Sequence, residues 1–429
     1  LYAVYMLRLW KATWDRKLSR LLLGLALLAV ACAPATSGDA PPAQATATAA
    51  VEPATVETAT VPLATATTTP EPTATSLPDE DVPSALQRSF DTDFSQRTIS
   101  FEEILSGGPP KDGIPAIDNP RFIGTDEADE WISDLEPVTV FEHDGDVRIY
   151  PFQILTWHEI VNDVVGGRPV TVTFCPLCNT AIVFDATVDG RELDFGTTGR
   201  LRYSNLLMYD RQTESWWQQA TGEAVIGEFV GRQLEFLPAP IISWAEARET
   251  YPDAQVLSRD TGFSRSYGQN PYAGYDNVNS SPFLFSGPST PEELPPMARV
   301  TTVELNGEAV AYPNEVLEEV RVANDTVGGV EVAVFWQEGL ASALDSNAIA
   351  AGRDVGANAV FERTLDGQTL TFVDDEGTIK DEQTGSTWNV LGEATAGELA
   401  GEQLQPVVKV DHFWFSWAAF RPDTRIYQP

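Results

Sequence analysis

Hydrophobic and polar residues are distributed differently in three consecutive parts of the chain. An unbroken apolar run extends from Leu21 to Ala31, after a stretch that carries five basic residues. This run is too short to span a membrane and is typical of an export signal. From Ala33 to about Ser84 the chain is mostly Ala, Thr and Pro without aromatic residues, and every Phe lies beyond it. We therefore predict a signal, an unfolded stalk and a globular part.

Within the globular part, short apolar runs alternate with turns that contain Gly, which predicts an α+β, strand-rich fold. One segment has the spacing of a helix. Its apolar stripe ends at Gly166-Gly167, and the stripe consists of Ile154, Leu155, His158, Val161 and Val165. Residues three and four apart share one helix face, so this pattern predicts one helix over the segment.

The globular part contains similar sequences twice. Residues 145–155 (GDVRIYPFQIL) match residues 307–317 (GEAVAYPNEVL), and residues 210–217 (DRQTESWW) match residues 381–388 (DEQTGSTW). These matches predict two related lobes produced by an internal repeat, each ending in a short aromatic helix that begins near Ser243 or Ser416. The predicted boundaries are 1–31 for the signal peptide, 32–84 for the anchor cysteine and stalk, 85–290 for lobe one with the segment between the lobes, and 291–429 for lobe two.

The end of the signal indicates where the mature protein resides. Residues 28–32 (LAVAC) resemble the lipobox of bacterial lipoproteins, although Ala29 stands where leucine is usual. Cleavage after Ala31 would make Cys32 the first residue and its lipidation site. We therefore expect an extracytoplasmic lipoprotein of the cell envelope that contacts the membrane through this anchor.

The charge of the chain excludes one class of partner. The formal net charge is −36, and removal of residues 1–31, with five basic residues and one acidic residue, changes it to −40. A surface this acidic repels phosphate groups, so we expect no nucleic-acid partner and no binding of anionic membranes through the folded domain.

The predicted repeat serves as an internal control, because positions needed only for folding should keep their chemistry in both lobes. At four positions a sulfur or imidazole side chain of lobe one has no counterpart in lobe two. In these pairs Cys175 matches Gln337, Cys178 matches Leu340, His158 matches Val320 and Met208 matches Ile379. We infer that a site in lobe one uses these residue types.

The sequence Cys-Pro-Leu-Cys, between two runs typical of strands, permits three interpretations. A structural disulfide across two intervening residues would close a very small loop and stabilise the fold little. A reversible dithiol/disulfide pair would need a neighbour such as His158 to lower the pKa of one thiol or to exchange its proton. No helical pattern follows Cys178, so the strand–turn–helix context of thioredoxin-like proteins is not predicted.

The third interpretation is a metal site. Asn179 tolerates the left-handed backbone that would aim two thiolates at one ion. His158 with Met208 or His412 would then complete the ligands. Two thiolates, one imidazole and one thioether favour copper, whereas two thiolates and two imidazoles favour zinc. A metal is therefore expected only in this alternative.

Several long motifs together resemble an uncharacterised bacterial and archaeal family, domain of unknown function 3179. The likeness covers about Ile99 to Pro429. The motifs are residues 106–122 (SGGPPKDGIPAIDNPRF), 157–167 (WHEIVNDVVGG), 172–181 (VTFCPLCNTA), 204–217 (SNLLMYDRQTESWW), 267–276 (YGQNPYAGYD) and 294–297 (LPPM). The family name includes "(seleno)protein", which implies that some members carry selenocysteine at a cysteine of this region. The resemblance thus favours redox chemistry at Cys175 and Cys178 and implies no mechanism.

From these observations we expect a redox protein with a Cys175/Cys178 dithiol centre, His158 as the acid/base neighbour, and an unknown substrate or redox partner. Such a protein would be a thiol-disulfide oxidoreductase. A copper- or zinc-binding lipoprotein that uses the same cysteines is one alternative. A cell-surface scaffold with a passive disulfide is the other.

Overall fold

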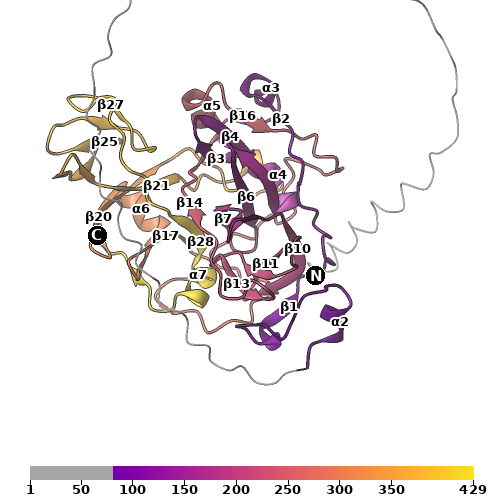
Figure 1. Ribbon diagram of the computed structural model, residues 1–429. Helices are drawn as coiled ribbons and strands as arrows, with labels where there is room; N and C mark the ends of the chain where they lie inside the picture. The colour runs from indigo at the N-terminus through magenta and orange to yellow at the C-terminus, as the bar shows by residue number, and fades with distance from the viewer. Residues whose placement is uncertain (1–80) are drawn as a thin grey trace, which may run out of the picture. The chain divides into compact units, whose positions relative to one another are not determined.

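The computed structural model describes residues 81–429 (Figure 1). The predicted signal peptide, Cys32 and most of the predicted stalk lie outside these residues. Within 81–429, every helix is too short or too polar to cross a lipid bilayer. The described residues are rich in strands and their helices are short, in agreement with the predicted strand-rich fold.

The predicted helix from Ile154 to Val165 is in fact a helix followed by a strand. Helix α4 (Phe152–His158) ends because Glu159 adopts a left-handed conformation with φ of 59°. Strand β5 (Ile160–Val165) follows, and its β-branched residues favour extended structure. Gly166 and Gly167, both with positive φ, form the hairpin turn into the next strand. The spacing of the apolar residues fitted one helix because it carries no information about the backbone conformation of Glu159, where the helix ends.

Residues 85–290, the predicted lobe one, contain three sheets and a two-stranded ribbon. The strands of the first sheet, in spatial order, are β1 (Ile104–Ser106), β10 (Phe195–Arg202), β11 (Asn205–Asp210), β12 (Trp216–Gln218) and β13 (Glu223–Ile226). The second sheet contains β14 (Phe236–Leu237), β7 (Thr180–Asp185), β6 (Arg168–Cys175) and β5. The third contains β15 (Ile241–Ser243), β3 (Pro137–His143), β4 (Asp146–Pro151), β16 (Gln255–Leu257) and β2 (Phe122–Gly124). The ribbon pairs β8 (Thr187–Val188) with β9 (Arg191–Glu192).

Lobe two also contains three sheets and a ribbon. Its first sheet consists of β28 (Val410–Phe413), β17 (Arg299–Leu305), β18 (Glu308–Pro313) and β29 (Arg425–Ile426). The second consists of β19 (Val322–Val327), β20 (Val330–Gln337) and β21 (Ala357–Glu362). The third consists of β24 (Phe372–Asp375), β25 (Thr378–Asp381), β26 (Thr387–Trp388) and β27 (Ala394–Ala396). The ribbon pairs β22 (Thr364–Leu365) with β23 (Gln368–Thr369).

Short helices connect these strands. Besides α4, they are α2 (Ser84–Gln87), α3 (Thr125–Asp129), α5 (Trp244–Thr250), α6 (Asn314–Val320) and α7 (Trp414–Phe420), with 3-10 turns at Phe101–Glu103 and Ile349–Ala351. The sequence predicted a helix that begins near Ser416, and helix α7 begins two residues earlier, at Trp414. Ser243 pairs with Pro137 and Phe413 pairs with Arg299, so Phe413 is the positional equivalent of Ser243. Both Ser243 and Ser416 precede a tryptophan, but strand pairing aligns Ser243 with Phe413 and not with Ser416.

Five consecutive elements occur in the same order in both lobes. The bounds of β17, β18, α6, β19 and β20 are each 162 residues higher than those of β3, β4, α4, β5 and β6, as in the pair that begins at Pro137 and Arg299. One polar contact also recurs. The Tyr150 hydroxyl donates to Asp163 at 2.7 Å, and the Tyr312 hydroxyl donates to Asp325 at 2.8 Å.

The hydrophobic interior is continuous between the lobes. One cluster of buried side chains contains Trp244 of lobe one together with Phe372 and Trp388 of lobe two. Strand β28 of lobe two also lies beside the turn that joins β6 and β7, where the Phe413 amide donates to the Cys178 carbonyl at 2.8 Å. Lobe two therefore forms part of the surroundings of the cysteines.

Candidate functional site

The Cys-Pro-Leu-Cys sequence forms the turn of a β-hairpin. Cys175 is the last residue of β6, and it pairs with Thr180, the first residue of β7. The Cys178 amide donates to the Cys175 carbonyl at 3.1 Å, which closes the turn. Asn179 has φ of 54°, the left-handed conformation expected from the sequence. A strand follows the second cysteine, so the context differs from the strand–turn–helix arrangement of thioredoxin-like proteins.

Both cysteines are buried free thiols. Cys175 is 2% exposed and Cys178 is 0% exposed. The Cys178 thiol donates to the Ser204 carbonyl at 3.5 Å, and the Cys175 sulfur lies 3.9 Å from the same oxygen. Burial raises the pKa of Cys175 well above its ordinary value, and the adjacent Cys178 and the charge of Glu159 raise it further. Without a base to accept its proton, Cys175 therefore stays protonated at neutral pH in the folded protein.

The thiols lie in an apolar cluster that excludes water. Met208, from the middle of β11, is fully buried in this cluster. The cluster also contains Trp217 and Phe195, and one residue from lobe two, Val410. The thioether of Met208 is thus part of the hydrophobic surroundings of the cysteines.

A buried carboxyl group, Glu159, directly follows helix α4 and was not singled out from the sequence. Its side chain is 7% exposed, and its charge acts on Cys175. Burial raises the pKa of Glu159 to about 8, although a hydrogen bond with Tyr272 opposes the increase. The Phe174 amide donates to the Glu159 carbonyl at 2.8 Å, which fixes the left-handed residue against β6. A group with this pKa can exchange a proton with a thiol near neutral pH.

The position equivalent to Glu159 in lobe two is Arg321. It has φ of 61°, and its carbonyl accepts from the Trp336 amide at 2.9 Å, so the backbone contact is the same. The guanidinium of Arg321 stacks on the Trp336 ring, however. The comparison of lobes that identified Cys175 would have identified Glu159 had it included acidic residues, but 63 of them occur in the chain.

The segment between the lobes covers the thiols with two tyrosines. The Tyr272 hydroxyl is hydrogen-bonded to Glu159, and burial followed by the charge of Glu159 raises the pKa of Tyr272 well above its ordinary value. The Tyr275 hydroxyl donates to the Leu177 carbonyl at 3.0 Å and accepts from the Phe283 amide at 3.2 Å. Both residues are partly exposed.

His158 is buried, but its ring is hydrogen-bonded away from the cysteines. Nδ1 donates to the Pro115 carbonyl at 2.7 Å, so Nε2 accepts from the Tyr267 hydroxyl at 2.7 Å. Tyr267 in turn contacts Thr261 at 2.5 Å. Burial lowers the pKa of His158 to about 4, so the ring is neutral at physiological pH. Both ring nitrogens are occupied by these contacts.

His412 supports the turn from the other side. Its Nδ1 lies 2.7 Å from the Thr180 hydroxyl, which also donates to the Cys178 carbonyl at 3.2 Å. Burial lowers the pKa of His412 to about 3. Within residues 81–429, no group of three or more His, Cys, Asp and Glu side chains is arranged to hold a metal ion. The predicted ligands Cys175, Cys178 and Met208 share one cluster, whereas His158 and His412 do not join them as ligands.

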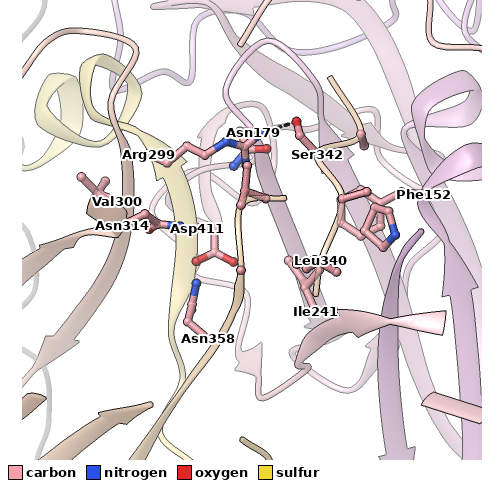
Figure 2. A pocket seen from close by; sticks show the side chains of 15 residues that line it. Phe152, Asn179, Ile241, Arg299, Val300, Asn314, Leu340, Ser342, Asn358 and Asp411 are labelled. Carbon is pink, nitrogen blue, oxygen red and sulfur yellow. Dashed lines mark hydrogen bonds between the residues drawn. The ribbon is translucent and has the colours of Figure 1, made fainter. Parts of the chain in front are cut away.

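A small pocket of about 40 Å³ opens between the lobes next to this turn (Figure 2). Asn179, which follows Cys178, lies at one end with Arg299 and Ser342, and Asn358 extends toward Asp411. The pocket has room for roughly three water molecules, so it is too small for an organic substrate.

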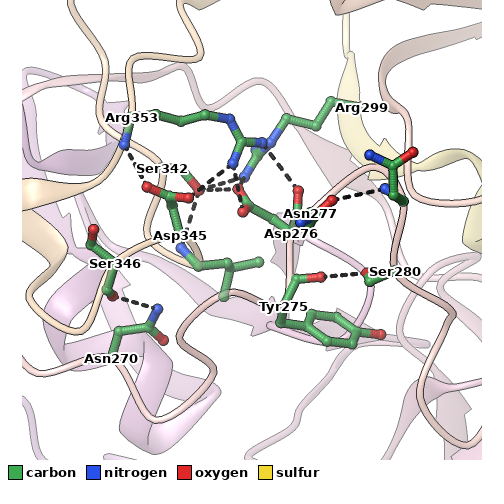
Figure 3. A network of polar contacts seen from close by, with 12 residues as sticks. Asn270, Tyr275, Asp276, Asn277, Ser280, Arg299, Ser342, Asp345, Ser346 and Arg353 are labelled. Atoms are coloured by element: carbon green, nitrogen blue, oxygen red, sulfur yellow. Dashed lines mark hydrogen bonds and ion pairs between the residues drawn. The ribbon is translucent and has the colours of Figure 1, made fainter.

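Arg299 belongs to a polar network that anchors the inter-lobe segment to lobe two. Arg299 and Arg353 converge on the buried carboxylate of Asp276 at 2.8 and 2.7 Å (Figure 3). Asp276 follows Tyr275 directly, so this network fixes the position of the tyrosines that cover the thiols.

The chain can now be placed in a family. A family model described as "Protein of unknown function (DUF3179)" matches residues 111–424. Because this match covers more than half of the chain, the protein belongs to that family, which confirms the resemblance seen in its motifs. No curated protein matches the chain, and no solved structure matches it.

Proposed function

We propose that the protein is a redox protein whose centre is the Cys175/Cys178 dithiol, with Glu159 as its proton acceptor. The supporting observation is a pair of buried thiols that share the Ser204 carbonyl, together with a buried carboxyl residue, Glu159, whose carbonyl is bonded to Phe174, the residue before Cys175. Disulfide formation releases two protons and two electrons, and an oxidant outside the protein accepts the electrons. Glu159 takes up the proton that Cys175 cannot release unaided.

The contacts of His158 lead us to propose Glu159, and not His158, as the acid/base group. His158 donates to Pro115 and accepts from Tyr267, so neither nitrogen is free to accept a proton from a thiol. We assign His158 a positioning role, because it precedes Glu159 directly and fixes the end of α4. Tyr272 completes the centre by donating a hydrogen bond to the ionised Glu159 carboxylate.

The proposal favours a dithiol over a bound copper or zinc ion because both ring nitrogens of His158 are hydrogen-bonded, and because residues 81–429 hold no group of three or more His, Cys, Asp and Glu side chains arranged for a metal ion. Thr180 contacts Nδ1 of His412, and the buried Nε2 of that ring has no partner among the described residues. Two thiols and Met208 would remain as soft ligands, too few for a closed four-coordinate site. A passive scaffold disulfide is disfavoured because a bridge across two intervening residues closes a very small loop and stabilises the fold little.

We further propose that export and lipidation at Cys32 place this centre outside the cytoplasm, on a stalk that ends near residue 84. The two lobes are proposed to be copies of one ancestral unit. Support comes from the five elements with a common offset and from the recurrent Tyr150–Asp163 and Tyr312–Asp325 contacts. In this account lobe two lost the reactive residues and keeps a structural role.

The redox proposal is tested by oxidising the folded mature protein with diamide, a small reagent that converts neighbouring thiols to a disulfide. The peptide containing both cysteines is then weighed before and after reduction with a phosphine. We expect it to become lighter by two hydrogens and to recover its mass on reduction, while the circular dichroism spectrum stays unchanged. A peptide that stays reduced, or a disulfide that forms only on unfolding, would refute the redox function.

A further inference from the structure

Resting on the proposed redox function, we infer that the oxidant of the Cys175/Cys178 pair is a small uncharged hydroperoxide and not the disulfide of another protein. Exchange with a protein disulfide requires a thiolate to reach a sulfur atom of the partner. Here the two thiols are 2% and 0% exposed. A folded partner therefore cannot bring its sulfur into contact with either one.

The cover over the thiols is held in place on two sides. Tyr275 is bonded to Leu177 and Phe283, and the Ser204 hydroxyl donates to the Phe283 carbonyl. On the other side, the Phe413 amide of lobe two donates to the Cys178 carbonyl. Opening the cover for a protein would break these contacts together with those of Asp276. A peroxide is close to water in size and needs only movement of a partly exposed ring such as Tyr272.

The electrostatics favour an uncharged oxidant. The thiols lie among apolar side chains, including Met208, Trp217 and Phe195. The charge of Glu159 acts on Cys175 as well. An anionic oxidant would lose its hydration in this cluster and would meet a second negative charge whenever Glu159 is ionised.

The reaction balances with the groups present. The ionised Glu159 takes the proton of Cys175, and the thiolate attacks one peroxide oxygen while the O–O bond breaks. The departing oxygen takes the proton from Glu159 and leaves as water or an alcohol. Cys175 is then a sulfenic acid. The Cys178 sulfur attacks it, the S–O bond breaks, and water leaves with the hydroxyl group and the Cys178 proton. The dithiol loses two electrons, and the peroxide gains them.

The structure also assigns the order of the two cysteines. Cys175 directly follows Phe174, whose amide donates to the Glu159 carbonyl at 2.8 Å, so Cys175 is the cysteine whose strand is bonded to the residue that carries the proposed base. The Cys178 thiol donates its hydrogen to the Ser204 carbonyl at 3.5 Å and lies beside Cys175. Cys175 is therefore the peroxidatic cysteine, and Cys178 is the resolving one.

The test mixes reduced mature protein separately with hydrogen peroxide, tert-butyl hydroperoxide, oxidised thioredoxin and diamide, and follows the mass of the cysteine peptide over time. We expect the peroxides to form the Cys175–Cys178 disulfide while oxidised thioredoxin leaves the thiols reduced. Glu159→Gln should slow the peroxide reaction at least ~100-fold. Arg321→Gln, at the equivalent position of lobe two, is the matched control and should keep the rate. Cys178→Ser should accumulate a sulfenic acid at Cys175 that dimedone traps.

The outcomes separate this inference from the proposed function. If diamide forms a reversible disulfide and peroxide does not, or if oxidised thioredoxin reacts as fast as peroxide, the substrate class is wrong and the dithiol function stands. If no oxidant closes the disulfide in the folded protein, both proposals are wrong. Dimedone labelling at Cys178 in a Cys175→Ser variant, with none at Cys175 in Cys178→Ser, would overturn the assigned order.

Discussion

The carbonyl of Glu159, the residue that ends helix α4, accepts a hydrogen bond from the amide of Phe174, the residue before Cys175 at the end of strand β6, and both Glu159 and Cys175 are buried. The left-handed conformation of Glu159, with φ of 59°, starts β5 beside β6, where the Phe174 amide binds the Glu159 carbonyl. The turn thus buries a carboxyl group whose charge acts on Cys175. Both groups are costly to ionise there, which explains why the pKa of each is raised by burial.

Replacing this carboxyl should change how the thiol depends on pH. In the wild type, the rate of Cys175 modification should increase as Glu159 ionises around pH 8, because the carboxylate is the base that accepts the thiol proton. Glu159→Gln should remove this inflection and slow the reaction below pH 9. Alkylation of the folded protein by iodoacetamide across this range, read by peptide mass, provides the measurement. An unchanged pH profile in the variant would show that Glu159 is not the base.

The same carboxyl group should destabilise the fold as the pH rises. Its pKa is 4.5 as a free side chain and about 8 in the folded protein. Between these values the unfolded chain releases the proton while the folded chain retains it, so stability is lost with increasing pH. We expect the Tm of Glu159→Gln relative to the wild type to increase from pH 4.5 to pH 8. A constant difference across this window would contradict the raised pKa of the buried group.

His158 should have the opposite effect at acidic pH. Burial lowers its pKa from 6.5 to about 4, so the unfolded chain binds a proton before the folded chain does. The stability that neutral His158 provides above pH 6.5 is therefore lost as the pH falls toward 4. We expect the free energy of unfolding, measured by chemical denaturation, to decrease less between pH 7 and pH 5 in His158→Gln than in the wild type. His412 has a similar shift, so His412→Gln serves as the comparison and should leave the His158 contribution in place.

The Asp276 network should hold the inter-lobe segment and its tyrosines in place. The Asp276 carboxylate is fully buried between Arg299 and Arg353, and the Arg299 side chain is only 13% exposed. Asp276→Asn leaves a buried guanidinium without its partner, which should lower the free energy of unfolding by about 3–5 kcal/mol. Asp345→Asn removes a partly exposed partner of Arg353 and should cost no more than about 1 kcal/mol. Equal losses in urea unfolding would contradict the assigned role.

Native burial should protect both thiols from large reagents. Cys175 and Cys178 are almost fully covered, so modification by a maleimide should be slow in the folded protein and fast in denaturant. Asp276→Asn should speed the reaction of the folded protein, because the segment that carries Tyr272 and Tyr275 loses its anchor. Rapid labelling of the folded wild type would show that the thiols are open to protein partners.

The sequence predicted the local features of the site and missed its long-range partners. The hairpin turn and the left-handed Asn179 followed from the Cys-Pro-Leu-Cys-Asn pattern, because a turn is specified by adjacent residues. The helix at Ile154 to Val165 was half wrong, since apolar spacing in a buried segment fits a short helix and a strand equally well. His158 was placed correctly in the interior, but its contacts with Pro115 and Tyr267 depend on distant loops.

Glu159 could not be identified from the sequence for a related reason. A glutamate next to a histidine is usually solvated, and only the turn between α4 and β5 directs it inward toward Cys175 and Tyr272. Its burial depends on the inter-lobe segment, which lies more than a hundred residues away in sequence. Ser243 and Ser416 both lie near the start of an aromatic helix, but the residue that pairs like Ser243 is Phe413. Strand pairing decides this equivalence, and it cannot be read from the local sequence.

The most direct test of the account is a redox titration of the folded mature protein with small mediators, from strongly reducing to strongly oxidising potentials, with the Cys175–Cys178 disulfide quantified by peptide mass. We predict one reversible two-electron transition that Glu159→Gln makes slower to reach, without loss of the fold. Thiols that remain reduced across the whole range, or that oxidise only as the protein unfolds, would show that this pair is not a redox centre.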